Sequence, residues 1–437
     1  MEPPEGLGDI RRTHLSSDMD PALDGEEVVV MGWVAAVRSH GNITFATIRD
    51  RTGPVQIVAK KGVCDDDLRT ILTKAKPHSS VAVRGRASAS ARAPGGVEII
   101  PNMLRVLSAA SRTPPFEPAT VTVPNIDTRL EVRCIDLRRE PLRHMFGART
   151  AVLRAVREYF YGNGFTEIST PKMIASATEG GSALFPIFYY DKEAFLAQSP
   201  QLYKEQLTMS FERVFEVSPI FRAEPSRTNR HLAEAISIDM EEAFVDYNDI
   251  MDRTAEVVRR AAGAVGEYAE RNPGSKYDIP DTVDIPRYTY EELAGRIHDE
   301  TDLHMEWGDD LHPSWLRRLG LDGMYFITDW PMGPKPFYVK TKQDDPRVSE
   351  SFDLMWGDLE LSSGSTRMND RDGLERNMRN KGMKTASFAH HLEAFEYGMP
   401  PHAGCGIGLE RLMMAMTGTG NIRDATFYPR DVDRLTP

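Results

Sequence analysis

Hydrophobic and polar residues alternate in five short runs within the first quarter of the chain. The runs are separated by glycine and aspartate and cover residues 27–37, 42–50, 53–59, 80–85 and 96–100. A period of two is typical of strands that bury one face. A single helix-like segment, 65–74, lies between the third and fourth runs. Five short strands and one helix predict an all-β barrel of the OB-fold type over residues 1–108.

The pattern becomes helical after this barrel. Apolar residues recur every three or four positions over 142–160, and two glycines follow as stop signals. Strand-like and helix-like segments then alternate, including a long helix expected over 248–271. We therefore expect a second, α+β domain over residues 136–437, with an insertion near 284–335. A stretch rich in proline and threonine predicts a linker over 109–135.

The composition is that of a soluble globular protein, with 41% apolar and 27% charged residues among 437. This length favours two domains. No run of about 18 apolar residues is present, which predicts no membrane span, and the acidic first residues lack the apolar core of a secretory signal. Cys64, Cys134 and Cys405 have no metal-ligand spacing. We therefore expect a cytoplasmic protein.

Charge is distributed unevenly along the chain. The net charge is −12, yet residues 38–105 contain 12 Lys and Arg against 5 Asp and Glu. A basic module joined to an acidic body is the pattern expected of a protein that binds a specific RNA. On charge alone, a solvated basic surface explains the pattern equally well.

An F-R-x-E motif at residues 221–224 follows an apolar strand and precedes a basic loop and a second strand. Two strands joined by a basic loop can enclose a triphosphate, because the planar arginine fork binds phosphate oxygens bidentately. Arg222 is then a candidate phosphate clamp, and Glu224 can accept from an adenine amino group. Arg230 and His231 can meet the outer phosphates. A surface ion pair is the simpler explanation of this motif alone.

A second motif, residues 404–412, consists of alternating glycines followed by Glu410, Arg411 and an apolar helix. Small residues let a strand approach a planar ligand closely, and Arg411 would stand in the first helical turn, directed at that ligand. The alternation differs from the dinucleotide G-x-G-x-x-G fingerprint. A glycine-rich strand packed on a helix is the structural alternative.

Acidic residues gather between these two motifs. Asp353 and Glu360 supply hard oxygen ligands, and Ser363 adds a hydroxyl group. Such oxygens suit a Mg²⁺ ion that bridges phosphates. The alternative is an ordinary strand with exposed carboxylates.

Taken together, these motifs occur in the order typical of class II aminoacyl-tRNA synthetases. Segments 177–181, 198–204, 363–367 and 428–437 resemble the archaeal-type aspartyl-tRNA synthetases more narrowly. The resemblance covers nearly the whole chain. It implies an OB-fold anticodon-binding domain, a class II catalytic domain, and a homodimer formed through the helix–turn–strand that ends at Pro171.

The resemblance also assigns roles to individual residues. It implies that Lys204 and Arg367 bind the side-chain carboxylate of aspartate, and that Glu179 holds its α-ammonium group. Arg222 and Arg411 would be catalytic. The remaining aspartate contacts are expected from Gln201, Arg222, Asp239 and Ser363. The ATP contacts are expected from Arg222, Ala223, Glu224, Arg230, His231, Leu232, Glu360, Gly408, Leu409, Glu410 and Arg411. The Mg²⁺ ligands are expected to be Glu360, Ser363 and Asp353.

The reaction implied has two steps. The α-carboxylate of aspartate attacks the α-phosphate of ATP to give aspartyl-adenylate and pyrophosphate, and the adenylate then esterifies the terminal 3′-hydroxyl of the tRNA. Positioning and charge stabilisation suffice without a protein nucleophile. Asparaginyl-tRNA synthetases lack the lysine that corresponds to Lys204, and a buried cation without its counter-charge would penalise asparagine. This lysine therefore favours aspartate.

In the family that the chain resembles, the barrel reads the anticodon. Phe45 is the expected stacking platform, worth about 1–3 kcal/mol for one base. Arg38, Gln56 and Glu98 are expected to read base edges. The alternatives are a core position for Phe45 and a solvated rim for the other three.

Two further positions predict the tRNA specificity. Archaeal relatives that charge only the aspartate tRNA carry a tryptophan shortly after the G-W-V of the first strand and a lysine in the loop before the last strand. Those places hold Ala35 and Pro94 here. Because both the bulk and the cation are missing, we expect a non-discriminating enzyme that charges tRNA(Asp) and also tRNA(Asn).

Four alternatives stay open at this point. They are a strictly discriminating aspartyl-tRNA synthetase, an asparaginyl-tRNA synthetase, a non-catalytic RNA-binding relative, and a free-standing asparagine synthetase on the same catalytic fold. The complete set of motif residues argues against the third. The basic barrel argues against the fourth, because amidation of a small molecule needs no RNA reader.

Overall fold

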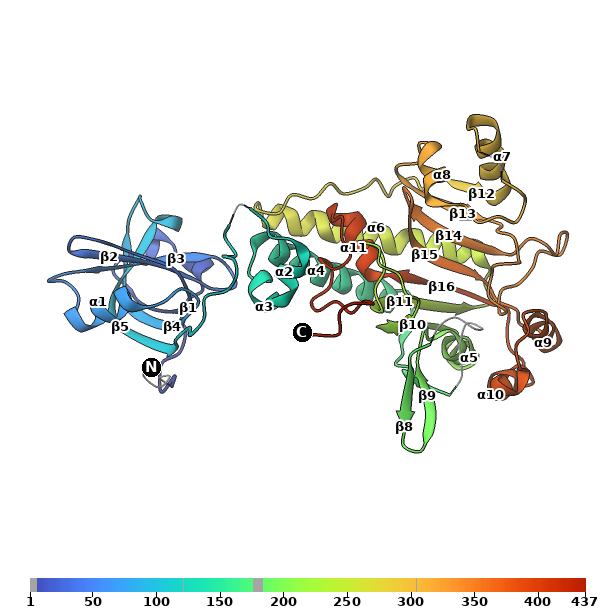
Figure 1. Cartoon of the computed structure of the whole chain (residues 1–437), viewed down its shortest axis with the longest axis horizontal. Helices are drawn as coiled ribbons and strands as arrows, with labels where there is room; N and C mark the ends of the chain where they lie inside the picture. Colours follow the sequence, from blue (N-terminus) through green and yellow to red (C-terminus); the bar gives the residue numbers. More distant parts are fainter. Residues whose placement is uncertain (1–5, 121, 176–183, 304) are drawn as a thin grey trace. The chain divides into compact units, whose positions relative to one another are not determined.

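The computed structural model describes residues 6–120, 122–175, 184–303 and 305–437. These residues form two compact units that divide between Pro115 and Phe116. Figure 1 shows the elements of each unit.

The first unit is a closed barrel of five strands in the order β1-β2-β3-β5-β4. Strands β3 and β5 pair in parallel, and the other neighbours pair antiparallel. Inward-facing valine and isoleucine side chains fill the barrel, so the predicted all-β barrel is confirmed. Its elements are η1 (Ser16–Asp18), η2 (Pro21–Leu23), β1 (Glu27–His40), β2 (Ile43–Arg49), β3 (Pro54–Lys60), α1 (Asp66–Lys74), β4 (Ser80–Ala89), η3 (Pro94–Gly96) and β5 (Val97–Ser108).

The second unit is built on a mixed sheet of eight strands in the order β12-β13-β14-β15-β16-β11-β10-β6, so the predicted α+β domain is also confirmed. A smaller sheet, β7-β9-β8, stands beside it. The strands are β6 (Thr166–Glu167), β7 (Met173–Ile174), β8 (Pro186–Tyr189), β9 (Lys192–Leu196), β10 (Arg213–Phe221), β11 (Glu234–Ala243), β12 (Arg287–Thr289), β13 (Met324–Thr328), β14 (Ser351–Trp356), β15 (Leu359–Thr366) and β16 (His402–Gly408).

Helices cover this sheet and complete the second unit. The largest core packs α4, α6 and α11 against one sheet face. Helix α6 matches the helix predicted over 248–271 to within one residue. The helices are α2 (Ile126–Glu131), α3 (Arg133–Asp136), α4 (Glu140–Gly162), α5 (Gln201–Phe211), α6 (Tyr247–Arg271), α7 (Tyr290–Glu300), α8 (Pro313–Arg318), α9 (Arg371–Asn380), η4 (Thr385–Phe388), α10 (Ala389–Phe395) and α11 (Leu409–Thr417).

Two segments with irregular sequence patterns have definite places in this unit. Within 116–135, Arg133 is 1% exposed; it donates to Asp136 at 2.5 Å and to the carbonyl oxygen of Phe427 at 2.9 Å. Within 284–335, β12 and β13 extend the large sheet, and α7 and α8 pack around them as a separate small core. Among the described residues, no helix has both the length and the apolar character that crossing a bilayer requires.

Candidate active site

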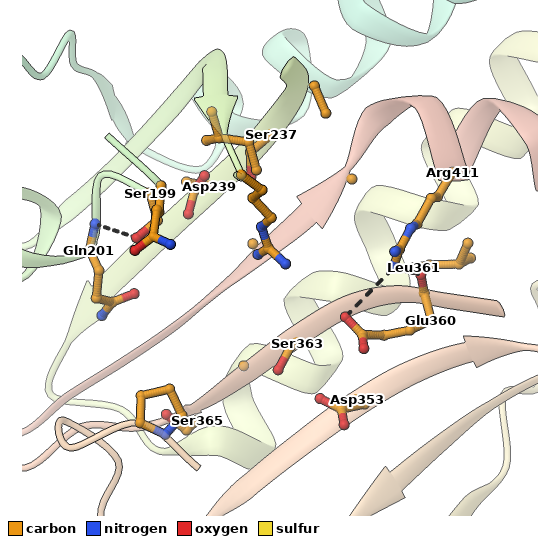
Figure 2. A pocket seen from close by; sticks show the side chains of 18 of the residues that line it. Ser199, Gln201, Ser237, Asp239, Asp353, Glu360, Leu361, Ser363, Ser365 and Arg411 are labelled. Atoms are coloured by element: carbon orange, nitrogen blue, oxygen red, sulfur yellow. Dashed lines mark hydrogen bonds and ion pairs between the residues drawn. The ribbon is translucent and has the colours of Figure 1, made fainter. Parts of the chain in front are cut away.

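A pocket of about 480 Å³ opens on the sheet face opposite the large core. Helix α5 and strands β10, β11, β14, β15 and β16 line it. Figure 2 shows its two ends: Gln201 and Asp239 lie at one end, and Glu360 and Arg411 lie at the other. The pocket therefore spans five neighbouring strands of the sheet.

The period of two along each strand directs polar side chains into this pocket. On β11, Ser237 and Asp239 line the pocket, whereas Ile238 between them belongs to the core. On β16, Gly406 lines the pocket and Ile407 lies in the core. The same alternation that makes one sheet face apolar thus makes the other face chemically active.

Most of the predicted site residues meet in this pocket. Its lining includes Gln201, Lys204, Arg222, Arg230, His231, Leu232, Asp239, Asp353, Glu360, Ser363, Arg367, Gly408, Glu410 and Arg411. The lining does not include Ala223, Glu224 or Leu409, and Leu409 is fully buried in the large core. Glu179 lies outside the described residues.

Glu410 has a structural partner as well as a place in the lining. Its carboxylate lies 3.0 Å from the guanidinium of Arg149 on α4 and accepts from the backbone N–H of Ile236 at 2.9 Å. Burial raises the pKa of Glu410, and the nearby Arg149 partly opposes this rise. The side chain therefore ties the start of α11 to α4 and β11.

Two buried cations define one end of the pocket. Lys204 is 2% exposed; its ammonium group lies 3.0 Å from Asp239 and 3.3 Å from Glu241. Arg367 is 4% exposed and donates to both oxygens of Glu241, at 2.8 and 3.2 Å. The two carboxylates therefore hold both cations in fixed positions.

These contacts keep the cations charged inside the protein. Burial alone would lower the pKa of Lys204, but the carboxylates of Asp239 and Glu241 outweigh burial and raise it. Burial opposes the charge of Arg367 too, and Glu241 raises its pKa. Among the described residues, Oδ2 of the buried Asp239 has no hydrogen-bond partner. A spare acceptor beside two cations suits a ligand that carries both carboxylate and ammonium groups.

Gly404 makes room for this arrangement. It pairs in register with Glu241, and a Cβ atom at position 404 would lie only 2.0 Å from Oε2 of Glu241. A larger residue would therefore displace the carboxylate that holds Lys204 and Arg367. The glycine run thus serves the protein's own ion pairs as well as any ligand.

Cationic side chains gather at the other end of the pocket. Burial lowers the pKa of His231, and the charges of Arg411, Arg222 and Arg230 lower it further. Burial also lowers the pKa of Arg411. The charge of Glu360 opposes this change, and the charges of Arg222 and Arg230 add to it. Like charges held this close favour the binding of an anion between them. This end of the pocket can therefore bind a polyanion such as a triphosphate.

Two carboxylates stand on neighbouring strands beside this end. Burial and the charge of Asp353 raise the pKa of Glu360. Glu360 exposes 48% of its side chain, but this exposed part lies in the pocket, where protein atoms limit its hydration. The Lys335 ammonium donates to Asp353 at 3.2 Å. In the described part of the chain, no three His, Cys, Asp or Glu side chains form a metal cluster. Two carboxylates and the Ser363 hydroxyl fit a Mg²⁺ ion that keeps water or phosphate ligands.

Sequence reasoning missed three charged residues around the amino-acid end. Glu241 follows Asp239 by two positions on β11, and Glu205 follows Gln201 by one helical turn on α5. The strand and helix periods would have indicated both. His402 gives no such local signal, because its position next to Glu205 depends on the long-range fold.

The four predicted base-reading residues share the outer surface of the barrel. Arg38 lies opposite Phe45, and Gln56 lies opposite Glu98 and donates to it at 3.4 Å. Phe45 is half-buried, alternates with the core residue Ala46, and does not belong to the barrel core. Its side chain can therefore meet a ligand on the barrel surface.

The two positions linked to tRNA specificity lie at irregular points of the barrel. Ala35 is exposed at a bulge of β1, where the register with β2 shifts between Val34 and Ala36. Pro94 begins the short turn η3, which precedes β5. The roles of both positions stay predictions.

Comparison with known proteins gives a consistent result for both units. The family described as tRNA synthetases class II (D, K and N) matches residues 125–432, and the OB-fold nucleic acid binding domain matches residues 28–107. The chain is 45% identical to the aspartate–tRNA(Asp/Asn) ligase of Methanothermobacter thermautotrophicus over 99% of its own length and 100% of that relative. The ligase of the same name from Archaeoglobus fulgidus is 45% identical over 97% and 99%.

Solved structures agree with this result. The asparaginyl-tRNA synthetase of Pyrococcus horikoshii, complexed with asparaginyl-adenylate, superimposes with a TM-score of 0.92 at 33% identity, covering 98% of this chain and 100% of that one. A putative aspartyl-tRNA synthetase from Leishmania major gives a TM-score of 0.88 at 25% identity, covering 100% and 96%. With the motif residues gathered in one pocket and the family match spanning most of its length, the chain belongs to the class II tRNA synthetases of the D, K and N group.

Proposed function

We propose that this protein catalyses the ATP-dependent ligation of L-aspartate to tRNA(Asp), and also to tRNA(Asn), through an aspartyl-adenylate. The observation that carries the choice of amino acid is the pair of buried cations, Lys204 and Arg367, at one end of the pocket. The names of the archaeal relatives support the same choice. The similar Pyrococcus structure is an asparaginyl-tRNA synthetase, so the likeness of fold alone does not decide between the two amino acids, and the charges must.

In this proposal the side-chain carboxylate of aspartate lies between Lys204 and Arg367. The α-ammonium group meets the spare oxygen of Asp239, with Glu179 as a further partner. Gln201 and Ser363 complete the hydrogen bonds. Because Asp239 and Glu241 already fix the two cations, little side-chain ordering is needed when the substrate binds, which favours affinity.

ATP would occupy the cationic end. Arg222, just after the end of β10, and Arg411, in the first turn of α11, would grip the phosphates, and Arg230 and His231 would meet the outer phosphates. Arg230 is already oriented by Asp358, to which it donates at 2.7 Å. The remaining predicted ATP contacts, at Ala223, Glu224, Leu232, Gly408 and Glu410, would surround the nucleoside, whereas the side chain of Leu409 lies in the core.

The carboxylates of Asp353 and Glu360, with the hydroxyl of Ser363, would hold Mg²⁺. Their mutual repulsion, evident in the raised pKa of Glu360, is the kind that a divalent cation relieves. When bound, Mg²⁺ neutralises part of the phosphate charge.

The chain's own residues then act by positioning and by charge. Lys204 and Arg367 hold the aspartate so that its α-carboxylate faces the α-phosphate, and Arg222 stabilises the negative charge that develops there. Arg411 holds the departing pyrophosphate. Positioning and charge stabilisation suffice for this reaction, so no serine, cysteine or histidine needs to form a covalent bond with the substrate.

The test is exchange of pyrophosphate into ATP with either amino acid. We expect exchange with aspartate, and a kcat/KM for asparagine lower by at least about 100-fold, the discrimination that a charged site can supply. Equal or faster exchange with asparagine would show that the charge argument is wrong. Exchange with neither amino acid would favour a non-catalytic RNA-binding role.

Relaxed tRNA specificity is tested separately by charging transcripts of both tRNAs side by side. The small, exposed Ala35 supports this part of the proposal, as do the Asp/Asn names of the relatives. We expect rates within about tenfold of each other, a difference of less than about 1.4 kcal/mol, because the contacts that would reject tRNA(Asn), each on the order of 1–3 kcal/mol, are missing in the proposal. Pro94→Lys should slow charging of tRNA(Asn) more than that of tRNA(Asp). If the wild type charges tRNA(Asn) orders of magnitude more slowly, the enzyme discriminates.

We also propose a homodimer formed through α4 and β6 and a location in the cytoplasm. β6 stands at one edge of the large sheet, and Tyr161 near the end of α4 is 54% exposed, so both can meet a second copy. The three free cysteines suit a reducing compartment. Sedimentation equilibrium at micromolar concentration would reveal a monomer if the dimer proposal is wrong.

A further inference from the structure

A second group of charged side chains lies directly behind the amino-acid end of the pocket. Glu205 follows Lys204 on α5, and His402 is the first residue of β16; both are 0% exposed. His391 of α10 is 3% exposed and lies beside them. The proposed reaction assigns no role to any of the three. Because a buried charge is costly unless it is paired, this group needs a physical explanation.

The surroundings of His402 determine its protonation state. Its Nδ1 atom lies 2.8 Å from the carbonyl oxygen of Pro400, and its Nε2 atom lies 3.5 Å from Oε2 of Glu205. Both ring nitrogens have an oxygen as their nearest polar neighbour, which favours a proton on each, although the Nε2–Oε2 contact is an ion-pair distance and too long for a hydrogen bond. Burial alone would lower the pKa of His402, but Glu205 and Glu241 raise it. The surroundings therefore favour the charged form of His402.

His391 is in the opposite state. Its Nδ1 atom lies 3.1 Å from the amide nitrogen Nε2 of Gln206, which can only donate, so Nδ1 accepts. The proton is then on Nε2, which faces Glu205 at 3.6 Å. Burial lowers the pKa of His391; the charge of Glu205 opposes this, and the positive charge of His402 adds to it. Burial therefore favours the neutral form of His391, and among the described residues His402 is the histidine whose pKa Glu205 raises.

Glu205 also orients a residue of the pocket. Its Oε1 atom accepts from Nε2 of Gln201 at 2.6 Å. This bond uses the amide donor of Gln201 and leaves its carbonyl oxygen as the group that can face the substrate. Loss of the Glu205 acceptor would therefore free Gln201 to rotate.

Among the described residues that form these ion pairs, the charges balance only when His402 is protonated. Three cations, Lys204, Arg367 and His402, then match three carboxylates, Asp239, Glu241 and Glu205. A neutral His402 would leave one carboxylate in excess before any substrate arrives. Such an excess repels the anionic side chain of aspartate and has little effect on the neutral side chain of asparagine.

We propose that Glu205 and His402 form a specificity-determining ion pair for aspartate, in which Glu205 orients Gln201 and His402 cancels the negative charge of Glu205. Both are positioning residues, since neither lines the pocket. The inference rests on the proposed function, because it concerns how that same site prefers aspartate over asparagine.

A double-mutant cycle of charge-neutralising substitutions tests the pair, using pyrophosphate exchange with aspartate and asparagine on the full-length protein. His402→Gln leaves Glu205 uncompensated, so the KM for aspartate should rise by at least about tenfold while the KM for ATP stays within about twofold. Glu205→Gln lets His402 lose its proton and keeps the balance, so its effect should be smaller. The double variant Glu205→Gln/His402→Gln restores neutrality, and its KM for aspartate should recover to within about threefold of wild type.

A purely structural role gives a different result. If the pair only supports packing, the two changes should add, so the double variant should be worse than either single variant and the KM for ATP should rise too. That outcome would overturn the inference. Thermal unfolding of each variant shows whether it is folded, and a wild-type enzyme without aspartate-dependent exchange would instead refute the proposed function.

The pH dependence of wild type provides a measurement that needs no variant. The groups facing His402 are Glu205 on α5, Glu241 on β11, His391 on α10 and the backbone of Arg367. His402 is charged below its raised pKa and neutral above it. The KM for aspartate should therefore rise as the pH increases through this pKa, which lies above the ordinary value of 6.5, and more steeply than the KM for asparagine. Parallel profiles for the two amino acids would contradict the inference.

Discussion

Replacing Lys204 with methionine preserves most of the side-chain volume and removes a buried charge. The ammonium group contacts Asp239 at 3.0 Å, Glu241 at 3.3 Å, and the carbonyl oxygen of Cys405 at 3.0 Å. In the variant, Glu241 keeps Arg367 as its partner, but Asp239 loses the one cation that pairs with it among the described residues. Removing one member of a buried ion pair costs about 3–5 kcal/mol, because the other charge stays buried. The free energy of unfolding of the catalytic unit should fall by this amount near neutral pH.

The loss should shrink in mild acid. An uncompensated buried carboxylate takes up a proton more readily than one in the unfolded chain, so the folded variant gains stability as the pH falls. Urea unfolding of Lys204→Met and wild type between about pH 7.5 and 5.5 would follow this effect. The difference in unfolding free energy should be largest at the higher pH.

In Lys204→Met, kcat/KM should fall for aspartate and not for ATP. A buried charge contact contributes about 2–5 kcal/mol, which corresponds to roughly 30- to 5,000-fold in kcat/KM for aspartate. The KM for ATP should change little, since the phosphate end keeps all its arginines. Pyrophosphate exchange at varied aspartate and then at varied ATP separates the two effects.

The matched control is Lys384→Met, the same substitution at an exposed position. It should leave both stability and exchange unchanged within error. The reasoning fails if folded Lys204→Met retains a wild-type kcat/KM for aspartate to within about threefold, a difference of less than 1 kcal/mol. It fails too if the variant loses affinity for ATP as strongly as for aspartate.

Four other substitutions have defined outcomes. Arg411→Ala should lower kcat/KM for ATP by roughly 100- to 1,000-fold in the exchange assay, with the KM for aspartate unchanged. In Gly404→Ala the added Cβ would push against Glu241, which should lower the free energy of unfolding by about 1–3 kcal/mol. In Gly263→Ala on α6 the added Cβ meets nothing, so the free energy of unfolding should rise by about 1 kcal/mol. Thermal melting distinguishes the two variants. Burial opposes the charge of Asp50, but hydrogen bonds lower its pKa. The charged Asp50 therefore stabilises the barrel fully at pH values above the ordinary pKa of 3.8, and this stabilisation is lost as the pH falls through the lowered pKa. Asp50→Asn removes the titrating group, so barrel unfolding should depend less on acid pH. Circular dichroism measures this dependence.

The barrel and the long helix α6 could be predicted from sequence because their signals are local. Alternating burial marks each barrel strand, and an aspartate cap with a matching acidic residue marks the start of α6. Two of the arginines that line the pocket were also predictable from local motifs, because Arg222 follows a strand and Arg411 begins a helix. In these cases a few neighbouring residues determine the geometry.

The ion pairs around the amino-acid end could not be predicted in the same way. Glu241 becomes important only because Arg367 and Lys204 reach it from two distant elements. His402 acquires its charge from Glu205, on another element of the unit. Leu409 shows the converse, since its place in a functional motif gave no indication that the helix turns its side chain into the core. Side-chain pairing across the sheet depends on register, and no single segment of sequence determines register.

Register also explains why the two ends of the pocket can act on one bond. Gly406 of β16 pairs with Asp239 of β11 on one side and with Ser363 of β15 on the other. Neighbouring strands lie about 4.8 Å apart, so the residues proposed for the α-ammonium group and for Mg²⁺ are separated by roughly 10 Å across a single shared strand. That span suits an amino acid joined to a phosphate, and the hydrogen-bond ladders on both sides of β16 prevent the two ends from moving apart. The reacting groups therefore need no large conformational change to meet, which is the positioning that this kind of catalysis requires.

Gly406 also keeps the space between the two ends open. A Cβ atom at position 406 would lie 3.2 Å from Oδ1 of Asp239 and would stand between both substrates, so the chemistry of the site favours glycine there as well as packing does.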